Sequence, residues 1–321
     1  MPNVVLRTEN LTKRYGSLTA VNNLTLEVYE GEIFGFLGPN GAGKTTSINM
    51  MCGLLEPDAG RVWIHDTPLD GDDKGARSRI GVCPQNVVLW ERLTCLEQLQ
   101  FVGQLYGGRA GEARRRANHL LEILGLTEKR NAMARTLSGG MQRRLNLALA
   151  LIHDPEIVVL DEPEAGLDPQ SRVGLLEYIR SLTREAQGVR PKTVILTTHN
   201  MDEADRLADR VAIIDYGELL ILDTPETLKQ RVGEGDIIEI RLSDSPADMA
   251  TVIAALAAIA AEVRWETAEH TLQVRALHAI SKLAELIEVL TALGLQPGEI
   301  NLRANTLEDV FIQLTGRRLR E

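Results

Sequence analysis

The sequence predicts an α/β protein whose first domain has a parallel sheet at its core, followed by a smaller α+β domain. Unbroken apolar runs of strand length, which are typical of strands buried on both faces, end at Leu37, Leu160 and Leu196. A glycine-rich loop and a helix-length segment follow the first of these runs. The chain has 321 residues. Because a single core usually stops growing at roughly 250 to 300 residues, a second domain is expected.

The glycine-rich loop from Gly38 to Thr45 fills every fixed position of the phosphate-binding pattern, which is a glycine, four residues, and then Gly-Lys-Ser/Thr. An apolar run at 32–37 before it and a helix-length run at 46–52 after it supply the strand-loop-helix context that the motif requires. Glycines let successive N–H groups turn toward one point, and the following helix N-terminus attracts negative charge. We therefore expect a polyphosphate here, with Lys44 on its β- and γ-phosphates and the Thr45 hydroxyl on magnesium. A turn that binds nothing is the simpler alternative.

The composition limits the compartment and the partners. A net charge of −10 gives a nucleic acid no general electrostatic attraction. The three cysteines have no paired short spacing, so they indicate neither a zinc site nor a disulfide framework and fit a reducing cytosol. The longest mostly apolar run, 249–261, is too short to span a membrane, and the N-terminus does not resemble a secretory signal. We expect a cytoplasmic chain that reaches a membrane only by docking on another protein.

Two short antiparallel strands are expected before the phosphate loop. Apolar residues alternate at 4–6 and 24–28, and the turn residues Tyr15-Gly16 and Asn22-Asn23 lie between these runs. We expect Tyr15 in a loop, where its ring is able to stack on a nucleotide base. A packed surface aromatic is the alternative for this residue.

A helical insert is expected at about 86–150. It follows strands at 61–64 and 80–85, the second of which ends at the polar Gln85. Leucines at helical spacing run from position 94 to 124. The basic run Arg114–Arg116 lies among glutamates, which favours a solvated helix face over a contact with nucleic acid.

Two later apolar strands end in polar side chains. The run at 157–163 closes on Asp161 and Glu162, and the run at 193–199 closes on His199. Ligands of open α/β sheets lie beyond the carboxyl ends of the strands, so we expect these side chains near the phosphate loop. The segment Leu137-Ser138-Gly139-Gly140 begins a helix and forms a second expected anion site, although such residues also make an ordinary cap or linker.

The order of these motifs resembles that of the ATP-binding cassette (ABC) ATPases over about the first 225 residues. The matching segments are Gly38–Thr45, Gln85, Leu137–Gly140, Ile157–Pro163, Gly166–Pro169 and His199. The resemblance implies an ABC-type phosphate-loop ATPase fold over 1–228, with a RecA-like parallel sheet core, an antiparallel β subdomain and a helical subdomain. It also implies that ATP and Mg²⁺ are bound.

The resemblance implies a role for each matching residue. ATP would be held by Tyr15 at the adenine and by Gly38, Asn40, Gly41, Ala42, Gly43, Lys44, Thr45 and Thr46 at the phosphates. Magnesium would be held by Thr45, Gln85 and, through water, Asp161. The catalytic residues would be Glu162 on the attacking water, His199 on the γ-phosphate, and Gln85, which links the metal to the transporter-facing surface. The residues acting across a dimer interface would be Ser138, Gly139, Gly140 and Asp168.

Two features of the sequence depart from the usual pattern of this family. Met141 and Gln142 follow the two glycines where glutamine alone is usual, a form similar to that of drug-resistance and ABC-2 exporter ATPases. Glu164 stands where threonine or serine is common after Asp-Glu-Pro. Its extra negative charge near magnesium is expected to slow turnover or to alter metal binding.

A second domain is expected over 236–321, after a hinge at Gly233–Gly235. Strands and helices are predicted at 237–242, 249–261, 263–274 (two strands about Glu269-His270), 279–293, 299–302 and 307–314. This βαββαβ order with an added helix is ferredoxin-like. The ending at 306–311 resembles the accessory tail of ABC-2 exporter ATPases. A regulatory or dimer-stabilising role and an inert stability module both stay open.

The function expected from the residues and the resemblance is that of the ATPase subunit of an ABC exporter. ATP would drive pairing with a second ATPase subunit, expected to be a second copy of this chain. A separate integral membrane permease would dock near 85–99 on the inner face of the cell membrane, and no nucleic acid partner is expected. A soluble ABC ATPase of DNA repair or translation is the alternative, but the chain has neither a long coiled-coil insert nor two cassettes. The presence of Glu162 and His199 disfavours ATP binding without catalysis.

Overall fold

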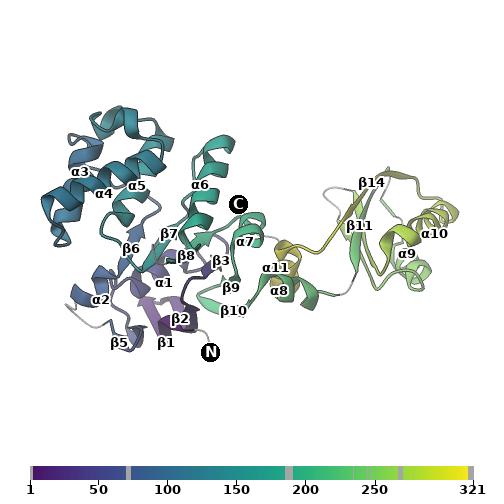
Figure 1. Cartoon of the computed structure of the whole chain (residues 1–321). Helices are drawn as coiled ribbons and strands as arrows, with labels where there is room; N and C mark the ends of the chain where they lie inside the picture. The colour runs from purple at the N-terminus through teal and green to yellow at the C-terminus, as the bar shows by residue number, and fades with distance from the viewer. Residues whose placement is uncertain are drawn as a thin grey trace. The chain divides into compact units, whose positions relative to one another are not determined.

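The computed structural model describes residues 3–69, 74–184, 191–233, 235–243, 245–246, 248–266 and 270–316. The described residues divide into two compact units, one up to Pro225 and one over 226–316 (Figure 1). None of the helices in these ranges is long and apolar enough to cross a membrane. The three cysteines, Cys52, Cys83 and Cys95, are free and buried.

A six-stranded sheet forms the core of the first unit, in the order β10-β9-β3-β8-β7-β6. All neighbouring strands are parallel except β10, which is antiparallel to β9. Every residue of β3, β7 and β8 is buried, as the unbroken apolar runs predict. The strands are β3 (Ile33–Leu37), β6 (Ile80–Cys83), β7 (Ile157–Asp161), β8 (Thr193–Thr198), β9 (Arg210–Asp215) and β10 (Glu218–Asp223). Because β3, β6, β7 and β8 run in the same direction, the loops that follow them lie along one edge of the sheet.

A second sheet of the first unit has the order β2-β1-β4-β5. Its strands are β1 (Val4–Tyr15), β2 (Leu18–Tyr29), β4 (Ala59–Ile64) and β5 (Thr67–Pro68). The prediction of two short strands was wrong, because β1 and β2 are 12 residues each and form one long hairpin. Tyr15 ends β1 and does not lie in a loop, and Asn22-Asn23 lies inside β2. Asn23 has a left-handed φ of 50° beside a shift in the β1–β2 register. The residues that resembled a turn therefore lie at a β-bulge within the strand.

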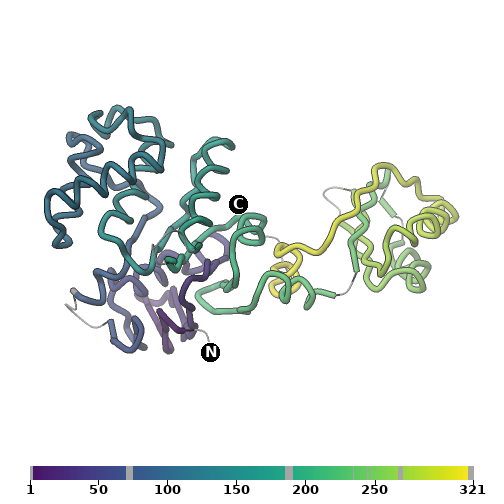
Figure 2. The backbone as a smooth tube through the Cα atoms, viewed as in Figure 1, coloured from purple at the N-terminus to yellow at the C-terminus, as the bar shows by residue number. Residues whose placement is uncertain are grey.

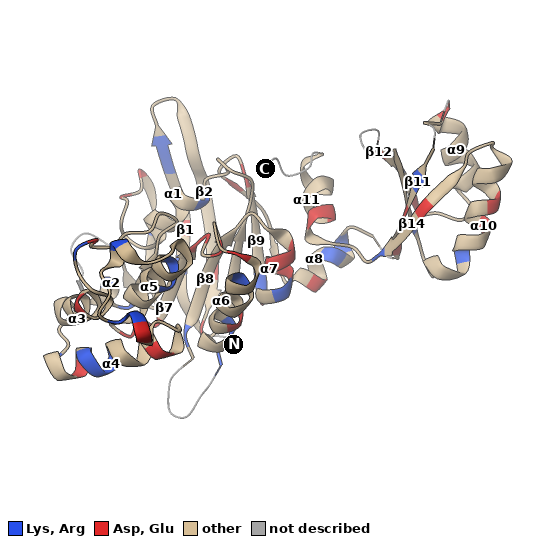
Figure 3. Cartoon of the chain, turned by 90° about the horizontal axis from the view of Figure 1, so that it is seen from above, with Lys and Arg blue, Asp and Glu red and all other residues tan. Residues whose placement is uncertain are grey.

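The helices of the first unit include the predicted insert, in which α3, α4 and α5 pack against one another. Figure 2 shows the chain leaving β6 into α3 and α4 and returning through α5 to β7. Acidic and basic residues mix along α4 (Figure 3), and Arg116 pairs with Asp154 in the loop after α5. The helices are α1 (Lys44–Met51), α2 (Lys74–Ser78), α3 (Cys95–Leu105), α4 (Ala110–Ile123), α5 (Gly139–Leu151), α6 (Pro169–Leu182) and α7 (Met201–Leu207).

The second unit has the βαββαβ order that the sequence predicts. Its sheet, β12-β13-β11-β14, is antiparallel throughout, and α9 and α10 pack against it around one apolar cluster (Figure 1). Its elements are α8 (Pro225–Arg231), β11 (Asp236–Leu242), α9 (Met249–Leu256), β12 (Glu262–Glu266), β13 (Thr271–Ala276), α10 (Ala279–Ala292), β14 (Pro297–Arg303) and α11 (Leu307–Thr315). The helix predicted at 249–261 ends earlier, because the N–H of Ala261 already bonds to the carbonyl of Arg275 in the sheet. Of the pair predicted between the two strands, Glu269 lies outside the described residues.

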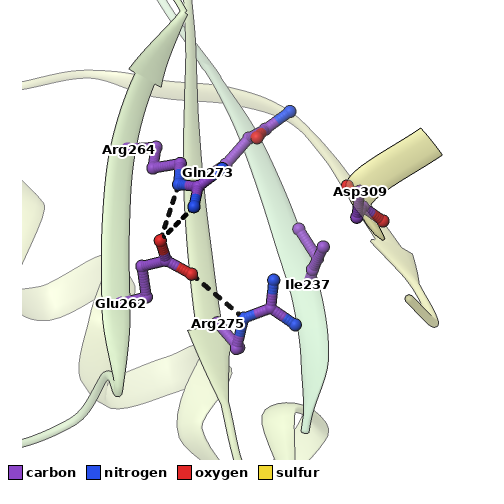
Figure 4. Close-up of a pocket in the computed structure, with 6 residues that line it drawn as sticks. All are labelled: Ile237, Glu262, Arg264, Gln273, Arg275 and Asp309. Carbon is purple, nitrogen blue, oxygen red and sulfur yellow. Dashed lines mark hydrogen bonds and ion pairs between the residues drawn. The ribbon is translucent and has the colours of Figure 1, made fainter. Parts of the chain in front are cut away.

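The other face of this small sheet is polar. Glu262 pairs with both Arg264 and Arg275, beside Ile237 and Gln273 (Figure 4). On the same unit, Arg303 pairs with Glu239 and Asp309. These guanidinium groups are therefore neutralised within the second unit.

Candidate active site

The phosphate loop joins β3 to α1. Glycine is required in this loop for two reasons, the backbone conformation and the lack of space for a side chain. Gly41 and Gly43 have φ values of 82° and 100°, which L side chains rarely adopt. A Cβ on Gly43 would lie 2.4 Å from the carbonyl oxygen of Ala20, and one on Gly38 would lie 2.4 Å from that of Ile214. A Cβ on Gly41 would meet nothing within 4 Å. The loop is thus packed from behind and open at Gly41, as a phosphate cradle requires.

Lys44 lies buried beneath this loop. Its ammonium donates to the carbonyl oxygens of Gly38 and Pro39 at 2.8 and 3.2 Å and lies 3.7 Å from Oε1 of Glu162. Burial lowers the pKa of Lys44, and the nearby carboxylates of Glu162 and Asp161 oppose that shift. The lysine is therefore a caged cation at the first turn of α1.

The carboxylate of Glu162 is the meeting point of the site. Gln85 Nε2 donates to its Oε2 at 2.9 Å, and His199 Nδ1 lies 3.2 Å from its Oε1, the oxygen that Lys44 also approaches. The backbone of Glu162 has a φ of 46°, a rare conformation for a residue with a side chain. Its N–H donates to the hydroxyl and the carbonyl of Thr197, which hold that conformation. The structure thus brings together four predicted residues from four separate segments.

Asp161 and Thr45, which the sequence analysis expects at magnesium, lie in contact with each other. The Thr45 hydroxyl donates to Oδ2 of Asp161 at 3.1 Å, and the Thr197 hydroxyl donates to Oδ1. Thr45, Asp161 and Gln85 line one cavity of about 510 Å³. Among the residues that the structure describes, no three His, Cys, Asp or Glu side chains could hold a metal ion. Mg²⁺ usually takes one or two carboxylates together with phosphate oxygens, so the Thr45 hydroxyl and the Asp161 carboxylate are ligands of the type that this ion accepts.

The second glycine motif lies apart from the phosphate loop. Ser138 caps α5 by accepting from the N–H of Met141, and Asp168 caps α6 by accepting from Ser171, which lowers the pKa of Asp168. A Cβ on Gly140 would lie 3.5 Å from Leu167, so the two caps are neighbours. In the described part of the chain, no hydrogen bond joins Ser138–Gly140 to the phosphate loop. Tyr15 is half exposed at the end of β1.

Glu164 differs from what the sequence suggested. Its side chain is buried, its Oε1 accepts from the Thr198 hydroxyl at 2.6 Å, and burial raises its pKa to about 7. Glu203, which pairs with Arg172, is the neighbouring carboxylate, and it also raises this pKa. Glu164 therefore carries less charge at neutral pH than an exposed carboxylate does.

The Glu164→Gln variant is expected to gain stability over the wild type as the pH rises from about 4.5 to about 7. The folded-state pKa lies above the ordinary value of 4.5, so in this window the folded chain holds a proton that the unfolded chain has lost. Wild-type stability then falls with rising pH, whereas glutamine does not titrate. We expect a difference on the order of 3 kcal/mol above pH 7 in urea unfolding.

The matched control for this measurement is Glu177→Gln, an exposed carboxylate of α6. Its unfolding free energy should follow that of the wild type across the same pH range. A Glu164→Gln difference that stays constant with pH would contradict the assignment of the buried proton.

Sequence reasoning missed two residues that support the site, Thr197 and Arg143. The signal for Thr197 was a polar residue one position before the end of a strand that is buried along its whole length. Arg143 lies on α5 and donates to backbone carbonyl oxygens. Every residue type has such an oxygen, so the sequence does not indicate which residues accept these hydrogen bonds.

A parallel sheet with a phosphate loop, an Asp-Glu pair at a neighbouring strand end and a strand-end histidine defines a phosphate-loop nucleotide hydrolase. The family model described as "ABC transporter" matches residues 21–165. The linearmycin resistance ATP-binding protein LnrL of Bacillus subtilis is 37% identical over 317 residues, covering 99% of this chain and 100% of that protein. The chain belongs to the family of ABC transporter ATPases and hydrolyses ATP, as the motif order predicted.

Comparisons with other relatives and with a solved structure support the same family assignment. A Nod factor export ATP-binding protein I of Ralstonia nicotianae is 41% identical, covering 99% of this chain and 95% of that protein. The daunorubicin resistance ATP-binding protein DrrA3 of Streptomyces coeruleorubidus is 36% identical, covering 100% of this chain and 99% of that protein. A dimeric ATP-binding cassette bound to ADP and Pi has a TM-score of 0.62 at 30% identity, covering 68% of this chain and 98% of that one. The predicted fold class is confirmed.

Proposed function

We propose that this chain powers an ABC exporter as its ATP-hydrolysing subunit. The observation that supports this most directly is the extent of the matches. Relatives named for linearmycin resistance, Nod factor export and daunorubicin resistance align with 99% to 100% of the chain. The similarity therefore includes the second unit as well as the ATPase. We propose a nucleotide-binding domain at 1–228 and an accessory domain at 236–321 on this basis.

The proposed roles follow the contacts around Glu162. Glu162 would orient and polarise the attacking water, with Gln85 and His199 fixing its carboxylate, and Lys44 would exchange its carbonyl partners for phosphate oxygens. Thr45, Asp161 and Gln85 would hold Mg²⁺. When bound, the ion neutralises charge on the β- and γ-phosphates. Tyr15, exposed at the end of β1, would stack on the adenine.

The separation of the two glycine motifs supports a site shared between two copies of this chain. Ser138, Gly139 and Asp168 are exposed, and Ser138–Gly140 has no hydrogen bond to the phosphate loop in the described residues. Helix N-termini attract phosphate, so these residues would cover ATP held by the other copy. The similar cassette bound to ADP and Pi is a dimer, which agrees with this arrangement.

The cavity beside the phosphate loop also suggests where a separate membrane permease docks. Besides Thr45 and Gln85 it is lined by Val88 and Trp90, which are 63% and 44% exposed. An exposed apolar group of this kind is typical of a protein contact. We propose that the permease binds here, at the inner face of the membrane, and that the chain is otherwise cytoplasmic.

Replacing Trp90 by aspartate is expected to abolish co-purification with the proposed membrane permease, because a carboxylate would be desolvated in the contact. The measurement is affinity capture from detergent-solubilised membranes after co-expression. Ile280→Asp is the control, since Ile280 is 77% exposed on the second unit. A wild-type chain that captures ribosomes or DNA and no membrane protein would favour the alternative of a soluble ABC ATPase in translation or DNA repair.

A further inference from the structure

Arg143 is a buried arginine in the second turn of α5, the helix that starts at Ser138. It is only 4% exposed, and its guanidinium donates to the backbone carbonyl oxygens of five residues. Nη1 reaches Pro84 at 3.2 Å and Gln85, Nη2 reaches Asp161 at 3.1 Å and Glu162, and Nε reaches Pro163 at 2.9 Å.

These carbonyls belong to two loops at the carboxyl edge of the sheet. Pro84 and Gln85 follow β6, and Asp161 to Pro163 end and follow β7. The side chains of Gln85 and Glu162, which belong to the same two loops, are joined by a hydrogen bond of 2.9 Å. Arg143 therefore holds the backbone at both ends of the hydrogen bond that orients the proposed catalytic carboxylate.

The shape of the guanidinium explains why arginine suits this position. It presents five N–H donors in a rigid planar fork, whereas a lysine ammonium is a single point with three donors. Asn146, one turn further along α5, adds to the same connection, because its side chain lies 3.4 Å from the Pro84 carbonyl and accepts from the N–H of Val88 at 3.3 Å. Without the fork, buried carbonyls of both loops would lose their partners.

We propose that Arg143 is a positioning residue, which fixes Gln85 and Glu162 relative to each other and ties both to the helix that begins with Ser138–Gly140. The inference rests on the proposed function, in which Glu162 acts on water. The proposed function assigns α5 to cover ATP that is bound by a second copy. Through the hydrogen bonds of Arg143, the same helix is also connected to the loops of its own chain that carry Gln85 and Glu162. Displacement of these loops by about 1 Å would be enough to lower turnover on the order of 10²-fold.

The test compares Arg143→Gln and Arg143→Lys with the wild type, using steady-state ATP hydrolysis and the Kd of a fluorescent ATP analogue. For Arg143→Gln we expect kcat to fall about 10²-fold while the Kd changes less than about threefold, since Lys44 and the phosphate loop are untouched. Arg143→Lys keeps the charge but not the fork, so an intermediate loss of about tenfold is expected. Arg116→Gln is the matched control, because Arg116 also donates to a carbonyl, that of Leu151, but far from these loops in the sequence.

A double variant separates positioning from general damage. If Arg143 acts through Glu162, adding Arg143→Gln to Glu162→Gln should lower the residual rate by less than about threefold. Full additivity, a kcat within threefold of the wild type in Arg143→Gln, or a Kd that rises as much as kcat falls would each overturn the inference. If Arg143→Gln does not fold, wild-type activity of Arg143→Lys would overturn it. A normal rate in Glu162→Gln alone would instead overturn the proposed function.

Discussion

The Glu162→Gln variant is expected to bind ATP and hydrolyse it about 10²- to 10⁴-fold more slowly than the wild type. The amide has nearly the shape of the carboxylate but is a far weaker base for the attacking water. The groups around Glu162, namely Gln85, His199 and Lys44, remain in place to receive ATP. Hydrolysis should therefore be lost with little loss of binding.

The same variant tests the shared site. If two copies enclose ATP, the complex that cannot hydrolyse it should accumulate as a dimer in size-exclusion chromatography with ATP and Mg²⁺. Glu177→Gln, which changes an exposed glutamate of α6, should hydrolyse ATP at the wild-type rate and should not accumulate as a dimer. A Glu162→Gln chain that stays monomeric at saturating ATP would argue against a site completed by a second copy of this chain.

The Lys44→Met variant is expected to lose ATP affinity by about 10²- to 10³-fold. Methionine is an unbranched side chain one heavy atom shorter than lysine, and it carries no charge for the phosphates. A charge pair 4 Å apart is worth about 4 kcal/mol at the effective dielectric constant of a protein surface. Isothermal titration with Mg-ATP measures this loss directly.

Thermal unfolding provides a second measurement of how much Lys44 contributes to ATP binding. ATP at about 100 times its Kd stabilises a protein by about 2.7 kcal/mol, so the wild type should melt at a clearly higher temperature with ATP. That shift should disappear in Lys44→Met. The control is Lys282→Met on α10, where a partly exposed lysine pairs with Glu285. Persistence of the full ATP-induced shift in Lys44→Met would show that ATP binds elsewhere.

The sequence predicted the parts of the site that are formed by polar side chains at the ends of strands. Glu162 and His199 each follow a buried parallel strand, and such strands end at a common edge. The contact of 3.2 Å between them was therefore foreseeable from strand order alone. The phosphate loop was foreseeable because only glycine tolerates the φ of 100° at Gly43.

The parts that the sequence did not predict depend on backbone groups or on distant partners. Arg143 bonds to carbonyls 18 to 59 positions away, and no residue type marks those acceptors. The long β1–β2 hairpin was read as two short strands because Asn23 adopts a left-handed φ in a bulge as readily as in a turn. The proton on Glu164 follows from burial beside Glu203, which is 39 positions away.

The burial of the cysteines has a practical consequence for watching this ATPase work. Burial raises the pKa of the Cys52 thiol to about 12 and that of Cys83 to about 11, and it also raises the pKa of Cys95. Since the thiolate is the reactive form, maleimide reagents should leave all three untouched in the folded chain. A single new cysteine at Val173, which is 57% exposed on α6, would then take a spin label or fluorophore selectively. If two copies of the chain pair around ATP, as proposed above, distances between their probes would report that pairing without first removing any native thiol.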